Sequence, residues 1–527
     1  MNMDLKQELD KRPDLQHLLF RRGWLVSTAK LDDLTGKFPF YDNWRLTSFA
    51  GLNFLVHREN DGLHTTETAN VKLALIGHCY NPFTMEHREA EQLAHIAKAY
   101  GSDAFVDRIN ELTGVFGLIW VDSKGIHFMT DPSGMQPVFY TAGNDNLWLT
   151  SHAQILGDVL GLEMGDFARE LVGYKWYRRV MGSYLPGDMS KFESVLLSVP
   201  DFIYTYSGDN VIHRRIYPIE DVEITATSPE YEAVINEGAR ILRCGAELVC
   251  RKWKRPSISL TGGIDSNTTF ASFNGNYDKV EAFSYLSAPK EVPDAAAAEK
   301  IAGRFGVPYR QFQIPDSNDG IKDFTLKAAI ISHNGGDIYP RPDNEIRKRI
   351  YLEENAGIEV EVKSWVSETI RAYWFKHYGR SKMPKMSPRV FRNIYKIFLG
   401  NRSLAHKVDR YFADYMNRFG YYALPHGVEY ADVFYNEITW GNWGGNAINE
   451  MRYICPLTFV YNNRKFLAAL NTVPLEDRIS DAHHLAMKRE LNRELYDMNI
   501  RVVNLKETAN RARGLNLIFT INNHLPF

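Results

Sequence analysis

Residues 257–266 read SISLTGGIDS, and this stretch decides the fold of the second half of the chain. An apolar strand at 257–260 runs into a Gly-Gly turn, and a helical stretch follows from Asn267. The two glycines let the backbone bend sharply and come close to a ligand. The N–H groups at the start of the helix point into the turn, where the helix dipole favours an anion. The stretch therefore predicts either a phosphate-binding strand–turn–helix unit or a tight turn capped by Asp265.

The side chains of this turn suit a phosphate ligand. Thr261 and Ser266 offer hydroxyl groups to phosphate oxygens. Asp265 would repel a phosphate unless Mg²⁺ lies between them, so we expect it to hold a metal or to brace the loop. No Gly-Lys-Ser/Thr follows at the needed spacing, so the string is not a Walker A loop. It is not a dinucleotide-binding fingerprint either.

Strands and helices alternate around this stretch. A helix is expected at 230–252, a second at 294–305, and strands at 280–285, 310–314 and 358–362. Such alternation predicts a parallel sheet with crossover helices. Most of residues 320–527 read as helical.

The first half of the chain has a different pattern. One helix is expected at 86–100, among short strands separated by turn residues. The strands are expected at 23–27, 46–56, 71–76, 114–121, 126–130, 138–141 and 147–151. The predicted fold is thus an α+β antiparallel sandwich followed by an α/β unit. We expect an extension at 1–44, a sandwich domain at 45–217 and a second domain at 228–527.

Composition narrows the function. The chain has 527 residues, 44% apolar residues and a formal net charge of −2. That balance argues against broad binding to nucleic acid or to a membrane surface. No stretch reaches the ~18 apolar residues of a membrane span. Without a CxxC pair among the cysteines, and without a signal-like N-terminus, we expect buried thiols in a cytoplasmic protein: Cys79, Cys244, Cys250 and Cys455.

Residues 261–266, TGGIDS, are similar to the SGGLDS pyrophosphate loop of the asparagine synthetase family. Downstream, 282–285, 305–307 and 336–339 resemble further segments of that family. Where the family has a Gly-Glu-Gly-x-Asp-Glu loop, this chain reads KSWVSETIRAY at 363–373. Here Glu368 and Tyr373 match the family, whereas its glycines and its aspartate are missing. In the first half, 112–122, 131–140 and 147–151 are similar to the family's glutaminase domain. The resemblance covers about 45–370, and 430–510 weakly.

The resemblance implies ATP and Mg²⁺ as cofactors, and transfer of AMP to a substrate carboxylate with release of pyrophosphate. An amine or ammonia then attacks the acyl-adenylate. A lysine near the C-terminus would stabilise the leaving group, and Lys506 and Lys488 are its candidates. Glu368 and Tyr373 would act on the incoming amine, with Asp265 at the metal. The implied nucleotide-binding residues are Ser259, Leu260, Thr261, Gly262, Gly263, Asp265, Ser266 and Ser284.

The departures from the family leave three functions open. Active glutaminase domains of this family use an N-terminal cysteine, but no cysteine precedes Cys79, which reads as a core residue. We therefore expect an inactive glutaminase-like domain, similar to those of β-lactam synthetases and lasso-peptide cyclases. The first function is an amide-forming synthetase acting on a small-molecule or peptide carboxylate and an amine. The second is asparagine synthesis from ammonia, and the third is an inactive ATP-binding scaffold. A homodimer is compatible with each.

Overall fold

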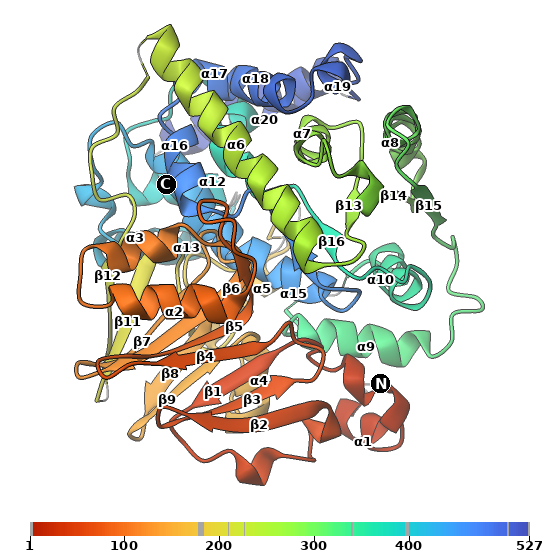
Figure 1. The fold of residues 1–527 in the computed structure, drawn as a ribbon. Helices are drawn as coiled ribbons and strands as arrows, with labels where there is room; N and C mark the ends of the chain where they lie inside the picture. Colours follow the sequence, from red (N-terminus) through yellow and green to blue (C-terminus); the bar gives the residue numbers. More distant parts are fainter. Residues whose placement is uncertain are drawn as a thin grey trace.

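The computed structural model describes residues 4–177, 184–208, 210–225, 227–338, 341–395, 400–502 and 505–524, and for 505–507 it describes the backbone alone. Two antiparallel sheets form the N-terminal half, and a parallel sheet lies in the second half beside many helices (Figure 1). The fold class predicted from the sequence is confirmed: an antiparallel α+β sandwich followed by an α/β unit with a parallel sheet and a helical C-terminal part.

The first antiparallel sheet has its earliest strand near its centre. Its spatial order is β10 (Leu196–Leu197), β8 (Phe139–Gly143), β9 (Asn146–Thr150), β1 (Trp24–Ser27), β3 (Leu52–His57) and β2 (Trp44–Phe49). Strand β1 pairs antiparallel with both β9 and β3. The stretch expected as an N-terminal extension, 1–44, therefore supplies a strand of the sandwich.

The second antiparallel sheet packs against the first and carries helices on its outer face. Its order is β12 (Asn210–Arg215), β11 (Phe202–Ser207), β7 (Gly125–Thr130), β6 (Thr113–Asp122), β5 (Lys72–Tyr80) and β4 (Leu63–Glu67). Alternate side chains of β6 point to opposite faces. Val115 and Ile119 join the core between the sheets, whereas Phe116 and Trp120 pack beneath α2 (Glu89–Ala99) and α3 (Ala104–Asn110).

One strand prediction in this half was wrong. The run at 46–56 was expected as a single strand, but it forms the hairpin of β2 and β3. Ala50 and Gly51 make the turn with positive φ angles of 56° and 80°. A turn on alanine gives no sequence signal comparable to Asn-Gly, so the two strands read as one.

The parallel sheet contains the strand that leads into the loop at 261–266. Its order is β15 (Tyr309–Gln313), β14 (Glu281–Leu286), β13 (Ser257–Ser259), β16 (Glu361–Val362) and β17 (Leu457–Thr458). From β13 the chain adds β14 and β15 on one side, and β16 and β17 on the other. The strand order therefore reverses between β13 and β16. In open parallel sheets, ligands bind at such a reversal, outside the carboxyl ends of the strands.

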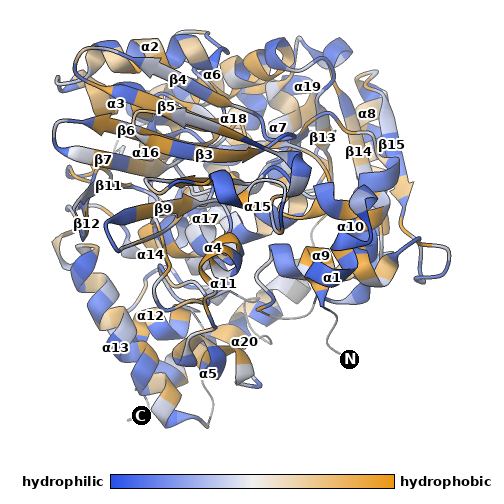
Figure 2. Ribbon diagram, turned by 90° about the horizontal axis from the view of Figure 1, so that it is seen from below, coloured by the Kyte–Doolittle hydropathy of each residue, from blue (hydrophilic) through white to orange (hydrophobic). Residues whose placement is uncertain are grey.

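Helices surround the parallel sheet and form the C-terminal part. The long α6 (Ser228–Lys252) crosses the molecule beside the sandwich (Figure 1). In Figure 2, α13 (Arg402–Arg418) shows both hydrophilic and hydrophobic positions, and its Leu404, Val408 and Phe412 are buried. The remaining α-helices are α1 (Leu5–Asp10), α4 (Ala153–Leu160), α5 (Asp166–Gly173), α7 (Ile264–Ser272), α8 (Val292–Arg304), α9 (Phe324–Asn334), α10 (Asp343–Asn355), α11 (Tyr373–Tyr378), α12 (Pro388–Tyr395), α13 (Arg402–Arg418), α14 (Tyr430–Phe434), α15 (Gly445–Met451), α16 (Arg464–Leu470), α17 (Leu475–Ser480), α18 (Ala482–Leu491), α19 (Arg493–Asp497) and α20 (Leu505–His524).

The N-terminal segment joins the two halves. Arg12 forms an ion pair with Asp323 at 2.7 Å, beside the start of α9. The Phe20 N–H donates to Asn334 Oδ1 at 2.8 Å, at the end of α9. Helix α9 lies between the N-terminal segment and α10 (Figure 1). None of the described helices is both long enough and apolar enough to cross a lipid bilayer.

Candidate functional site

The loop between β13 and α7 is closed by its own hydroxyl groups. Ser266 Oγ accepts the Thr261 N–H at 3.1 Å and lies 2.9 Å from Thr261 Oγ1. Thr261 Oγ1 also accepts the Gly263 N–H at 3.1 Å. The first backbone N–H groups of a helix have no partner within it. Thr261 and Ser266 thus shape the turn, and an N-terminus of this kind is a type of site at which proteins bind anions.

Gly262 is needed for packing rather than for contact with a ligand. Its N–H donates to Asp294 Oδ1 at 2.9 Å, and its carbonyl accepts the Val502 N–H at 3.2 Å. A Cβ atom at this position would lie 2.2 Å from Val502 Cγ2. The first glycine therefore lets residue 502 close over the loop, at the entry to the segment that leads to α20.

A cavity of about 500 Å³ lies against this loop, where the strand order reverses. All the nucleotide-binding residues implied by the resemblance line it except Gly262. Glu368 lines it as well, from the short 3₁₀ helix Trp365–Ile370 that follows β16. The lining residues are Ser259, Leu260, Thr261, Gly263, Asp265, Ser266, Phe283, Ser284, Tyr285, Glu291, Asp294, Ala295, Lys363, Ser364, Trp365, Glu368, Trp440 and Trp443.

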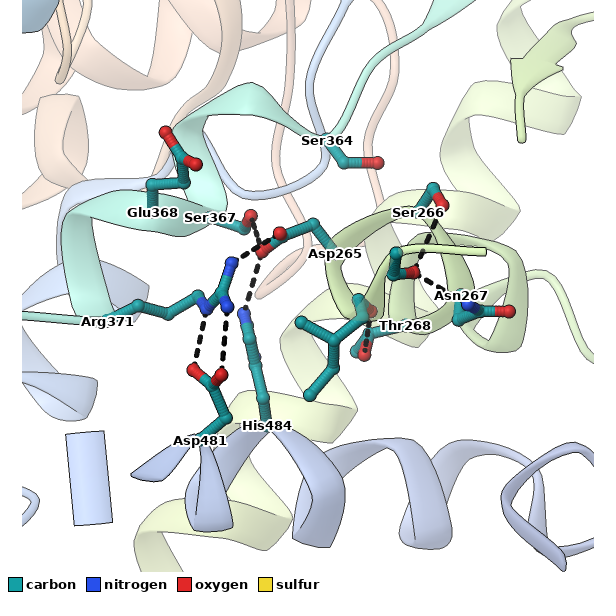
Figure 3. Close-up of polar contacts among 12 residues, drawn as sticks. Asp265, Ser266, Asn267, Thr268, Ser364, Ser367, Glu368, Arg371, Asp481 and His484 are labelled. Atoms are coloured by element: carbon teal, nitrogen blue, oxygen red, sulfur yellow. Dashed lines mark hydrogen bonds and ion pairs between the residues drawn. The ribbon is translucent and has the colours of Figure 1, made fainter. Parts of the chain in front are cut away.

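Asp265 is the centre of a polar network beneath the loop (Figure 3). Its carboxylate accepts hydrogen bonds from Ser367 Oγ and from the guanidinium of Arg371. His484 Nε2 lies 3.4 Å from Asp265 Oδ1. Arg371 also forks onto Asp481, with nitrogen–oxygen distances of 2.8 and 2.9 Å. Burial opposes ionisation of Asp265, but Arg371 and His484 outweigh it, so the pKa of this carboxyl lies well below its usual range.

This network does not fit a metal site built by the protein. Both carboxylate oxygens of Asp265 already have partners, one of them the cation of Arg371. Within the described residues, no group of three or more His, Cys, Asp or Glu side chains is arranged to hold a metal ion. Of the two roles expected for Asp265, its contacts favour bracing of the loop over metal binding.

Glu368 has a tyrosine partner, but it is not the one expected from the sequence. Tyr435 donates a hydrogen bond to Glu368 Oε2 at 2.6 Å. Tyr373 instead stacks on the Tyr435 ring, with centroids 4.4 Å apart. Glu368 turns away from Asp265 and Arg371 (Figure 3). Burial, followed by the charge of Asp265, raises the pKa of Glu368 above its usual range.

A second cavity, of about 230 Å³, meets the first at Glu368. Tyr373 lines this second cavity and not the first. Its other lining residues come from the region of Arg371 and from α20: Arg371, Lys376, His377, Thr508, Arg511, Ala512 and Leu515. Lys376 pairs with Asp481, and burial lowers its pKa to about 8. Glu368 therefore lines both cavities. The first contains the loop at 261–266, and the second is lined by more basic side chains.

The two candidate lysines lie on different helices, α20 and α18. Lys506 lies in the first turn of α20, and its side chain is outside the described residues. Lys488 lies on α18, four residues after His484, and is 4% exposed. Burial, followed by the charge of Arg501, lowers the pKa of Lys488 to about 8. Arg501 precedes Val502, whose N–H bonds to the carbonyl of Gly262, but Lys488 is not among the residues that line the cavity.

Several residues of the site were not found from the sequence. Arg371, His484 and Asp481 come from segments without a phosphate-like motif, and only the fold brings them to Asp265. The indoles lining the cavity were also missed, although Trp365 stands inside the segment where the family's glycines are absent. The replacement of small residues by large ones in this segment was the sequence signal that could have revealed Trp365 as a site residue.

The sequence matches no protein-family model, and it is similar to no curated protein. Two solved structures show a distant likeness. One is a glutamine phosphoribosylpyrophosphate amidotransferase from B. subtilis in complex with ADP and GMP, with 13% identity over 68% of this chain and 73% of that chain, and a TM-score of 0.22. The other is an allosteric regulatory enzyme of purine biosynthesis, with 13% identity over 66% and 70% of the two chains, and a TM-score of 0.23. Both scores lie below the level at which a shared fold can be inferred.

Proposed function

We propose that this protein is an ATP-dependent synthetase that adenylates a carboxylate and joins it to an amine. The observation that carries the proposal is the cavity at the strand reversal, which joins the anion-binding loop to Glu368. The TGGIDS string supports ATP as the nucleotide through its resemblance to asparagine synthetases. A carboxylate alone is a poor acyl donor, and AMP supplies the leaving group that amide formation needs.

The loop supports the first half of this reaction. The N-terminus of α7 and the hydroxyl groups beside it offer donors to phosphate oxygens. Lys488 and Lys506 are the two lysines proposed to meet the charge of the leaving pyrophosphate. We propose that Mg²⁺ arrives with ATP as part of the substrate, because Asp265 is already paired with Arg371.

Glu368 supports the second half. As the amine nitrogen bonds to the acyl carbon, the bond to AMP breaks, and the nitrogen must lose a proton. Glu368 lines the cavity, and its Oε1 makes no hydrogen bond with a described residue. We assign that oxygen as the acceptor of the proton. A carboxyl with a raised pKa is a stronger base than an ordinary glutamate. Tyr435 holds the carboxylate in place, and Tyr373 supports Tyr435.

Glutamine hydrolysis is not part of this proposal. Cys79, the cysteine of the sandwich, is fully buried in β5, and burial raises the pKa of its thiol well above the usual value. A thiol of this kind is a poor nucleophile. Free ammonia as nitrogen donor, with asparagine as product, remains a second proposal. Formation of asparagine from aspartate, ATP and ammonium, but not from glutamine, would distinguish it.

An inactive ATP-binding scaffold is the third proposal. The pairing of Asp265 with Arg371, where the resemblance implied a metal ligand, is the observation that favours it. In that case the Asp265→Ala variant would leave the biological activity of the protein unchanged.

The decisive experiment is exchange of labelled pyrophosphate into ATP with a panel of carboxylic acids. We expect exchange that depends on one class of acid. Gly263 offers a matched pair of variants, because a Cβ atom there meets only Thr261 Oγ1, at 3.2 Å. Gly263→Asp places a negative charge in the anion site and should abolish exchange and MgATP binding. Gly263→Asn, of the same size and neutral, should retain MgATP binding. Equal behaviour of the two variants, or no exchange with any acid, would argue against the proposal.

A further inference from the structure

Three tryptophans line the cavity together with the loop at 261–266. Trp365 stacks on Trp443 with ring centroids 5.5 Å apart and on Trp440 at 5.9 Å. Trp440 and Trp443 are themselves 5.4 Å apart. All three line the cavity. Trp440 is 1% exposed and forms the back of the wall, whereas Trp365 and Trp443 are partly exposed. We call these three residues the indole wall.

The backbone around the indole wall is arranged to make room for it. Trp440 and Trp443 lie in a π-helix, Tyr435–Gly444, which is a wide turn that often occurs at functional sites. A Cβ atom on Gly444 would lie 2.5 Å from Trp440 Cε3. A glycine at that position thus allows the ring to lie against the backbone. Two large apolar rings remain partly exposed at a cavity, which is how proteins present a surface for a flat or apolar ligand.

The charges around the cavity favour a cation beside this wall. Four carboxyl side chains line it, against one ammonium group. Lys363 is paired with Glu361 at 2.6 Å, and Asp265 with Arg371. Glu368 forms no ion pair within the described part of the chain. A ligand with a positively charged nitrogen would therefore be attracted both by Glu368 and by the faces of the indoles.

We propose that the nitrogen donor is an organic primary amine with a flat or apolar body, and not ammonia. Its body would lie on Trp365 and Trp443, with its nitrogen toward Glu368. This inference rests on the proposed function, because it identifies the second substrate of that reaction. It assigns the indole wall as the element that selects the amine. Ammonia has no body to place on the wall and would gain only the contact with Glu368.

The test uses the full chain and measures binding by calorimetry and saturation-transfer NMR. The probes are phenethylamine, its neutral counterpart 2-phenylethanol, ammonium chloride and phenylacetate. We expect phenethylamine to bind at least tenfold more tightly than ammonium, since each aromatic contact contributes about a factor of two to thirty. Trp443→Ala should weaken phenethylamine binding about tenfold and leave MgATP binding unchanged. Trp148→Ala, on β9 outside the cavity, is the control and should change neither.

A second variant tests the contribution of the amine nitrogen to binding separately from that of the ring. Glu368→Gln should weaken binding of phenethylamine but not of 2-phenylethanol, because only the amine carries a charge. The comparison of phenethylamine with ammonium needs no variant, so it stands even if Trp443→Ala fails to fold.

Three results would overturn the inference: equal affinity for ammonium and phenethylamine, no effect of Trp443→Ala in a folded protein, or tighter binding of phenylacetate. The last result would assign the wall to the acid substrate. If amine binding holds while pyrophosphate exchange fails, the proposed function is wrong and the amine site remains.

Discussion

The two walls of the cavity are built on opposite principles. The loop wall consists of a strand end, two glycines and small hydroxyl side chains, and its donors are backbone N–H groups. The second wall consists of large indoles, with the side chains of Lys363 and Glu368, contributed by segments distant from the loop. A loop that binds through its backbone needs a short string of small residues, so sequence reveals it. A wall made of side chains from two distant segments leaves no such string. The first wall could therefore be predicted from the sequence, whereas the second could not.

The largest expected effect comes from the buried charge that joins the walls. Arg371→Ala leaves Asp265 buried without its cation and should destabilise the protein by about 3–5 kcal/mol. The measurement is the denaturant midpoint, together with hydrogen exchange of the α7 amides. Arg493→Ala is the control, because its pair with Asp497 is exposed, and it should cost less than about 1 kcal/mol. Equal losses in the two variants would show that the walls are not coupled through Arg371.

The loop wall can be tested at its tightest point. Gly262→Ala places a methyl group against Val502 and should weaken MgATP binding by about 1–3 kcal/mol. The cause is displacement of the segment at 501–502 from the loop. Gly263→Ala has a wider space and should bind MgATP nearly as well as the unaltered protein. Weaker MgATP binding by Gly263→Ala than by Gly262→Ala would contradict this expectation.

Glu368, which lines the second wall, offers a test between two stacked tyrosines. Tyr435→Phe removes the hydrogen bond to Glu368 and should reduce stability by about 1–2 kcal/mol. Tyr373→Phe keeps the stacked ring and should cost less than about 0.5 kcal/mol. Burial raises the pKa of Tyr373 to about 12, so its hydroxyl stays protonated at neutral pH. Thermal unfolding of both variants measures these losses of stability. A greater loss of stability with Tyr373→Phe would indicate that Tyr373, and not Tyr435, is the partner of Glu368.

The smallest expected effect is a change with pH. The pKa of Glu368 is raised in the folded protein, so its contribution to stability is complete below the pKa of the unfolded chain. That contribution is lost as the pH rises through the folded pKa. Glu368→Gln removes this loss while keeping an oxygen for Tyr435. We expect the variant to gain stability relative to the unaltered protein as the pH rises from the pKa of an unfolded glutamate through the raised pKa of Glu368. A difference that does not vary with pH would contradict the raised pKa.

Sequence reasoning reached the fold class through periodicity and through one string of residues. The strand, turn and helix at 257–272 lie close to their expected positions, because an apolar strand, two glycines and a helical stretch follow one another directly in the sequence. The partner of Glu368 could not be found in this way. Tyr435 is far from Glu368 in sequence, and a π-helix has no recognisable pattern. Arg371 is visible in the sequence, but its contact with Asp265 depends on how α7 and the 3₁₀ helix meet.

The position of β1 in the first sheet has a consequence for how the chain is made. On a ribosome, β1 is synthesised before both of its neighbours, and its partner Thr150 in β9 follows more than a hundred residues later. The hydrogen bond from the Phe20 N–H to Asn334 can form only after a further 314 residues have been synthesised. At the usual speed of translation that interval is about 15–60 s. The strands of the sandwich are all synthesised by the time the chain reaches Arg215, but the N-terminal segment reaches its contact with α9 only after Asn334 has been made.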